Sequence, residues 1–91
     1  MGHKVWSKFL KLLQGADEKE LDTLFHLFMT KNEREMLVER YTLVKTLLSE
    51  KYTQREISEK LGMSISLVTA GSKALQLLKE QDKQFLKERM K

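Results

Sequence analysis

Residues 53–75 read TQREISEKLGMSISLVTAGSKAL, and this stretch decides the fold. Gly62 separates two short amphipathic segments, and glycine tolerates the positive φ that a tight turn between two helices requires. In the first segment, Ile57 and Leu61 are spaced i, i+4, so both face the interior of a helix pair. Ser58 is small, as is needed where two helices cross closely. The first segment and Gly62 therefore predict a helix followed by a turn of three or four residues.

The second segment predicts another helix directly after that turn. Ser64 is a favourable N-cap, and Val68 lies four residues later on the inward face. The remaining exposed side chains are short and suit a groove: Ile65, Ser66 and Thr69. Together the two segments predict a DNA-binding helix-turn-helix at about residues 53–72. A plain helical hairpin with a glycine turn is the alternative.

In a helix-turn-helix, the start of the second helix enters the major groove and the first helix crosses the DNA backbone. Arg55 lies in the first turn of the first helix, where it can reach a guanine edge bidentately or a phosphate. A surface ion pair with Glu59 at i+4 is the alternative for this arginine.

The rest of the chain also predicts helices. It has no proline and four glycines, and apolar residues recur at helical spacing throughout. Gly15 fits the C′ position of a first helix. Three capping boxes predict three helix starts: Asp17 with Glu20, Thr30 with Glu33, and Thr53 with Glu56. The first three helices each carry an apolar stripe. These stripes are Trp6, Phe9, Leu10 and Leu13 in the first helix; Leu21, Leu24, Phe25 and Phe28 in the second; and Leu37, Tyr41, Val44 and Leu48 in the third. After the second segment, Leu75, Leu78, Phe85 and Leu86 predict a continuing amphipathic helix.

Composition predicts one small all-α domain over residues 1–91. A chain of 91 residues without cysteine is only marginally stable alone, so oligomerisation is a natural way to enlarge its core. The net charge is +4, and the whole excess falls after residue 50, which suits a C-terminal region facing nucleic acid. No segment approaches the roughly 20 apolar residues that span a bilayer, and no signal-peptide pattern begins the chain. We therefore expect a cytoplasmic protein without a membrane partner.

An enzyme is not expected. The two histidines, His3 and His26, stand far apart in sequence, and there is no cysteine nucleophile. The sequence also lacks a glycine-rich phosphate loop and a metal-ligand cluster. His26 lies among Leu24, Phe25, Leu27 and Phe28, which predicts a partly buried structural histidine.

Five segments carry a resemblance that covers nearly the whole chain: Trp6-Ser7-Lys8-Phe9, Leu27-Phe28-Met29-Thr30, Asn32-Glu33-Arg34-Glu35, Thr53-Gln54-Arg55-Glu56 and Gly71-Ser72-Lys73-Ala74-Leu75. With these segments the chain resembles the Trp repressor family. The resemblance implies a six-helix, all-α, intertwined homodimer with two DNA-reading heads about one DNA turn apart. Such a dimer would bind a palindromic double-stranded operator and act as a transcriptional repressor.

The resemblance also implies a pocket for L-tryptophan, the family's corepressor. Leu27, Met29 and Thr30 match the positions that supply pocket walls and backbone carbonyls for the ligand's ammonium. Arg40 matches one of two arginines that sandwich the indole, and Gly71 matches the glycine beside the ring. A surface ion pair of Arg40 with Glu35 or Glu39 is the alternative.

The second arginine of the family is replaced here by Ala70, which can neither stack on an indole nor hold a carboxylate. Leu67 and Ala74 replace a threonine and a serine, so this side of the pocket becomes more apolar. Losing a charge-assisted bidentate contact costs about 1.5–3 kcal/mol, or one to two decades of affinity. We expect L-tryptophan to bind weakly or not at all. No cofactor is predicted, but a small indole-type or other flat aromatic effector fits what remains.

The DNA contacts carry over more completely. Arg55, Ile65, Ser66 and Thr69 match positions that face base edges, and Ser72 and Arg40 match positions that serve the backbone. Glu39 should repel phosphate, while the positive charges of Lys60 and Lys73 compensate for that repulsion. The resulting hypothesis is a sequence-specific, homodimeric transcriptional repressor. The alternative is a helical protein-interaction module of the same fold that no longer regulates through DNA.

Overall fold

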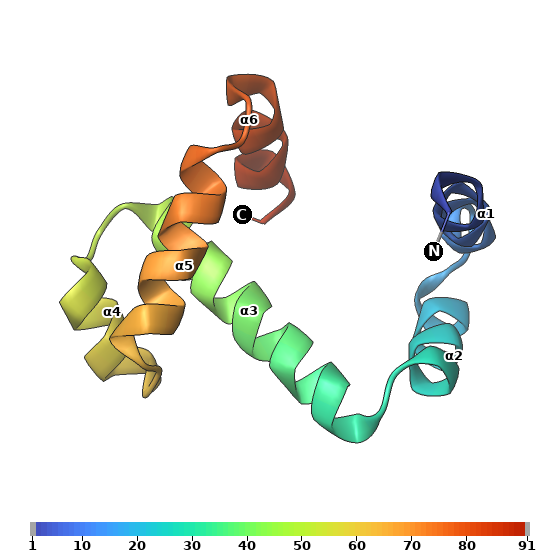
Figure 1. Cartoon of the computed structure of the whole chain (residues 1–91), viewed down its shortest axis with the longest axis horizontal. Coiled ribbons are helices and arrows are strands. Elements are labelled where there is room, and N and C mark those ends of the chain that lie inside the picture. Colours follow the sequence, from blue (N-terminus) through green and yellow to red (C-terminus); the bar gives the residue numbers. More distant parts are fainter. Residues whose placement is uncertain (1, 91) are drawn as a thin grey trace. The chain divides into compact units, whose positions relative to one another are not determined.

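The computed structural model describes residues 2–90, which form six α-helices without a β-strand. Their bounds are α1 His3–Leu13, α2 Glu18–Phe28, α3 Lys31–Ser49, α4 Gln54–Leu61, α5 Ile65–Gln76 and α6 Glu80–Arg89 (Figure 1). The predicted all-α, six-helix chain is thus confirmed. Within these described residues, no helix is both long enough and apolar enough to cross a membrane.

The chain divides into two compact units, one up to Glu35 and one from Met36 onward, and the boundary falls within α3. In the first unit, α1 ends as predicted, because Gly15 follows the C-cap with a φ of 77° in the left-handed region. The capping box at the start of α2 also forms, since the Asp17 carboxylate accepts the backbone N–H of Glu20 at 2.8 Å. The glycine and the capping box in the sequence therefore predict the position of the α1–α2 connection correctly.

An aromatic cluster holds the first unit together. The rings of Trp6 and Phe9 stack with centroids 5.6 Å apart, and the ring of Phe28 meets Phe9 edge-on at 5.7 Å. These contacts join the predicted stripes of α1 and α2. Trp6 and Phe28 nevertheless remain about half exposed, so the cluster is not a closed core.

The second unit contains the fully buried side chains of the described chain: Leu43 of α3, Ile57 of α4 and Val68 of α5. Ile57 and Val68 are inward as predicted. The predicted stripe of α3 is less accurate, because Leu37 and Tyr41 are exposed and Leu43, one position off that stripe, is buried. The turn between α4 and α5 brings these two helices side by side (Figure 1).

The C-terminal region differs from the continuing helix that its apolar pattern predicts. Helix α5 ends at Gln76, and α6 begins only at Glu80. The chain bends between them with Leu77 largely exposed, so the apolar period is interrupted. Leu75, Leu78 and Leu86 are partly buried, whereas Phe85 is 54% exposed.

Candidate nucleic-acid interface and ligand pocket

The turn of the helix-turn-helix is closed by Gly62 and Ser58. Gly62 has φ 66° and ψ 30°, the left-handed conformation that glycine adopts without steric cost. Its backbone N–H bonds the carbonyl of Ser58, and the N–H of Met63 reaches the same carbonyl at 3.1 Å. The Ser58 hydroxyl in turn donates to the Met63 carbonyl at 2.5 Å. Ser58 therefore fixes the turn through its hydroxyl, a role that its small size alone did not predict.

Both helices of the pair begin at the predicted caps. The Thr53 hydroxyl accepts the backbone N–H of Glu56 at 3.2 Å, and the Glu56 carboxylate accepts the backbone N–H of Thr53 at 2.9 Å. The Thr53 backbone N–H, with a smaller effect of its hydroxyl, lowers the pKa of Glu56. The Ser64 hydroxyl accepts the N–H of Leu67 at 3.2 Å and starts α5. Local hydrogen bonds thus set where the two helices of the reading head, residues 53–72, begin.

Most of the predicted DNA-facing side chains lie on the exposed surface of this head. Arg55, Ser66 and Lys73 are exposed, and Ile65 is 49% exposed. The alternative pairing of Arg55 with Glu59 does not form, because the one ion pair within residues 2–90 joins His26 and Asp22. The Arg55 guanidinium is therefore free of any protein carboxylate in the described chain.

Two other side chains predicted to contact DNA, those of Lys60 and Ser72, are partly engaged by other residues of the protein. The Lys60 ammonium lies 5.3 Å from the centre of the Tyr52 ring, in cation–π geometry. Ser72 is partly buried in a hollow of about 180 Å³ formed by residues of α3, α5 and α6. Both side chains are less available for a phosphate than their positions in the sequence indicate.

Thr69 makes a contact that sequence reasoning missed. Its hydroxyl donates to the side-chain oxygen Oε1 of Gln54 at 2.9 Å, and this bond links α5 to the first residue of α4. Gln54 was not among the predicted site residues. No local pattern marks it, because its partner lies 15 positions along the chain.

A pocket of about 410 Å³ lies in the second unit, within the usual size range of small-molecule sites. It brings together five predicted ligand residues: Arg40, Leu67, Ala70, Gly71 and Ala74. The other lining residues were not predicted and are all apolar: Leu43, Val44, Leu75, Leu78 and Leu86. Arg40 is the single charged residue of the lining and, within residues 2–90, it pairs with neither Glu35 nor Glu39.

Gly71 fits the pocket wall because α5 approaches α3 closely there. A Cβ at this position would lie 2.8 Å from Cδ2 of Leu43 and 3.4 Å from Cδ1 of Leu47. Leu43 is 2% exposed and has little freedom to move aside. A Cβ at position 71 would therefore require Leu43 to shift, independently of any ligand.

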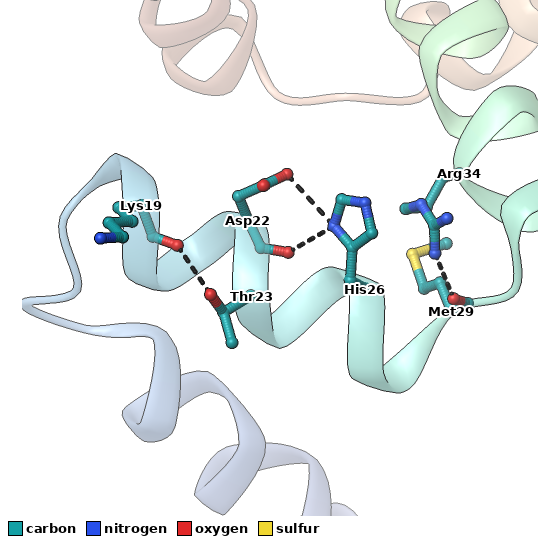
Figure 2. A network of polar contacts seen from close by, with 6 residues as sticks. All are labelled: Lys19, Asp22, Thr23, His26, Met29 and Arg34. Carbon is teal, nitrogen blue, oxygen red and sulfur yellow. Dashed lines mark hydrogen bonds and ion pairs between the residues drawn. The ribbon is translucent and has the colours of Figure 1, made fainter.

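Leu27, Met29 and Thr30, the other predicted ligand residues, belong to the first unit. Leu27 is 74% exposed, and the Thr30 backbone N–H is taken by the Glu33 carboxylate at 2.8 Å. The Met29 carbonyl accepts a hydrogen bond from Nη1 of Arg34 at 2.7 Å (Figure 2). That carbonyl keeps one lone pair for another donor.

His26 is not the partly buried structural residue that its apolar neighbours predict. Its side chain is 55% exposed, and Nδ1 lies 2.8 Å from the Asp22 carbonyl and 3.3 Å from the Asp22 carboxylate (Figure 2). The ring points away from the apolar face because it bonds one turn back along α2. Across residues 2–90, no three His, Cys, Asp or Glu side chains are grouped so that they could hold a metal ion.

Comparison with known proteins identifies the relatives of this chain. The family model described as Trp repressor protein matches residues 4–90. A Trp operon repressor homolog of Chlamydia trachomatis serovar D is 45% identical over 82 residues, covering 89% of this chain and 87% of that protein. A homolog with the same description from Chlamydia caviae is 42% identical and covers 90% of this chain and 82% of its own length. Another, from Vibrio vulnificus, is 38% identical and covers 86% of this chain and 78% of its own length. These matches confirm the resemblance drawn from the sequence.

Proposed function

Because this chain belongs to the Trp repressor family, we propose that it is a homodimeric repressor that binds a palindromic double-stranded DNA operator. The family consists of transcriptional regulators, not enzymes. As part of this proposal the chain forms one domain and acts in the cytoplasm, where a regulator meets its operator.

The observation that carries the proposal is the geometry of residues 53–72. Two capped helices meet at a left-handed glycine, and the start of the second helix carries exposed, short side chains. Arg55 stands beside them without a protein partner within the described residues. This arrangement supports base reading from the major groove by the start of α5, with Arg55 on a base edge or a phosphate.

The homodimer is supported by the small core of the described chain. Three side chains are fully buried, whereas many large hydrophobic residues are exposed, among them Trp6, Leu27, Phe28 and Val38. Exposed apolar surface of this extent is typical of an interaction surface. A second copy of the chain would cover it and enlarge the core.

The pocket supports a different effector from L-tryptophan. Ala70 offers no partner for a carboxylate, and Ala74 offers no hydroxyl for an ammonium. The remaining lining is apolar apart from Arg40, whose planar guanidinium can stack on a ring. We propose that a flat aromatic or indole-type molecule without an amino-acid head group controls DNA binding.

The function is tested by selecting bound duplexes from random DNA, with and without a panel of indoles. We expect a palindromic consensus whose affinity falls steeply with salt, because neutralised phosphates release counterions. Arg55→Ala should weaken discrimination among sites. A dimer that selects no sequence at any salt concentration would refute the repressor function and favour a protein-interaction module.

A further inference from the structure

The pocket that contains Arg40 also has a wall from the C-terminal helix. Most of its lining residues belong to α3 and α5, but Leu78 and Leu86 come after α5 has ended at Gln76. Leu78 lies in the bend between α5 and α6, and Leu86 lies within α6. A molecule in this pocket of about 410 Å³ would therefore touch α6 as well as α3 and α5.

The burial pattern of α6 shows which of its side chains face the rest of the second unit. Lys83, Leu86 and Met90 are partly buried, and their spacing of three and four residues places them on one face of the helix. Phe85 is 54% exposed, and the Cζ atom of Arg89 lies 5.3 Å from the centre of its ring. The α6 side chain in the pocket wall is thus Leu86 and not its aromatic neighbour.

The chemistry of this wall restricts what a ligand can place against it. Neither Leu78 nor Leu86 has a side-chain donor or acceptor, so a polar substituent buried there would lose its water without gaining a hydrogen bond. An apolar substituent would be favoured by burial, provided that it fits beside the Leu86 side chain. The bulk of Leu86 therefore limits the size of an apolar substituent on the α6 side of the ligand.

We infer that Leu86 determines which aromatic effectors fit, and that the effector is a small fused-ring molecule with no polar group on the edge that faces α6. This inference rests on the proposed control of DNA binding by an aromatic effector in this pocket. It extends the ligand site to α6, beyond the residues matched by the family resemblance, none of which lies after Ala74.

The test exchanges bulk between the protein and the ligand. Indole is compared with indoles that carry a propyl group at different ring positions, and isothermal titration calorimetry measures their dissociation constants for the full-length wild type, Leu86→Ala and Phe85→Ala. Leu86→Ala removes from the wall the same number of carbon atoms that a propyl group adds to the ligand. Phe85→Ala is the matched control, because it truncates a neighbouring side chain of α6 that is outside the pocket lining.

We expect the affinity of at least one propylindole relative to indole to rise by about tenfold or more in Leu86→Ala, because a single methylene in a hydrophobic pocket already changes discrimination by about tenfold. Phe85→Ala should keep the wild-type ratio. Partial unfolding does not change this ratio, since a smaller fraction of competent protein weakens the binding of both ligands equally. Leu86→Val removes a single carbon atom and should change the ratio in the same direction by less, and it provides the test if Leu86→Ala does not fold.

Two results would overturn this inference while leaving the proposed effector intact. One is a propylindole-to-indole ratio that Leu86→Ala and Leu86→Val leave unchanged for every ring position. The other is an equal change of the ratio in Phe85→Ala, which would attribute the effect to the packing of α6 as a whole and not to the pocket wall. A wild type that binds neither indole nor any propylindole would overturn the inference and the proposed effector together, whereas selection of a DNA sequence without ligand would still support the repressor function.

Discussion

Replacing Ala70 by arginine should create an L-tryptophan site in this chain. Ala70 lies on the wall of the 410 Å³ pocket that also contains Arg40. It is exposed, so a long side chain can extend from it without displacing buried atoms. A guanidinium there would supply the carboxylate partner that the pocket lacks, and would place a second planar cation beside the ligand ring.

The magnitude follows from the strength of a charge-assisted hydrogen bond, about 1.5–3 kcal/mol, at about 1.4 kcal/mol per decade of affinity. Because position 70 is exposed, solvent screening places the gain in the lower half of that range. We expect Ala70→Arg to bind L-tryptophan about ten- to fortyfold more tightly than the wild type. The gain for indole, which has no carboxylate, should be much smaller.

Isothermal titration calorimetry with L-tryptophan and indole measures both effects. Ala70→Met is the matched control, because it adds length and apolar surface without a charge. Equal gains in the methionine and arginine variants would show that packing, and not the carboxylate contact, limits affinity. Micromolar binding of L-tryptophan by the wild type would refute the reasoning from Ala70 altogether.

Three further changes test the fold and its charges. Gly71→Ala should lower the thermal unfolding midpoint, because its Cβ would lie 2.8 Å from Leu43 Cδ2. Overpacking costs about 1–3 kcal/mol and the helix-propensity gain is about 1 kcal/mol, so the net cost is at most about 2 kcal/mol; a raised midpoint would contradict this. Val68→Ala, at a residue 0% exposed, should cost about 2 kcal/mol in urea unfolding, and an unchanged midpoint would show that Val68 is not core. Hydrogen bonds from Thr53 lower the pKa of Glu56 in the folded protein. The ionised Glu56 carboxylate therefore stabilises the fold fully at a pH above its pKa in the unfolded chain, and this stabilisation is lost as the pH falls through its pKa in the folded chain. Urea unfolding from pH 6 to pH 3 should therefore show a weaker acid destabilisation in Glu56→Gln than in the wild type, and identical pH profiles would contradict it.

Sequence reasoning was most accurate where structure is set by neighbours along the chain. The boxes at Thr30 and Thr53, the cap at Ser64 and the turn at Gly62 all form, because each depends on groups within a few residues. Ile57 was also placed correctly, since an i, i+4 pair on a short helix leaves few alternatives.

It was less accurate where a distant residue decides the outcome. Leu43 is buried because α4 and α5 pack over it, and the pattern of α3 alone favours the neighbouring stripe. The bond from Thr69 to Gln54 spans 15 positions and has no periodic signature. The prediction that His26 is partly buried was wrong, because it rested on the apolar neighbours in the sequence and did not include the contact of the ring with Asp22 of the same helix.

Only part of the pocket lining was predicted, because the rest depends on contacts between residues that are distant in sequence. Its predicted residues on α5 were found through the family resemblance, and they do line one cavity with Arg40. Leu78 and Leu86 joined that lining only because the chain bends after α5, which the continuous apolar pattern did not predict.

The small core, three fully buried side chains within residues 2–90, has a thermodynamic consequence for how this protein responds to its own concentration. If two copies share their apolar surface, association and folding are one equilibrium, and the unfolding midpoint rises with protein concentration. Dilution then acts as a denaturant. Unassembled chains would present the exposed surface of Trp6, Leu27 and Val38 to proteases and to other chains. A repressor built in this way sets a lower limit on its own useful concentration, below which operator occupancy is lost through unfolding and not through weak DNA contacts.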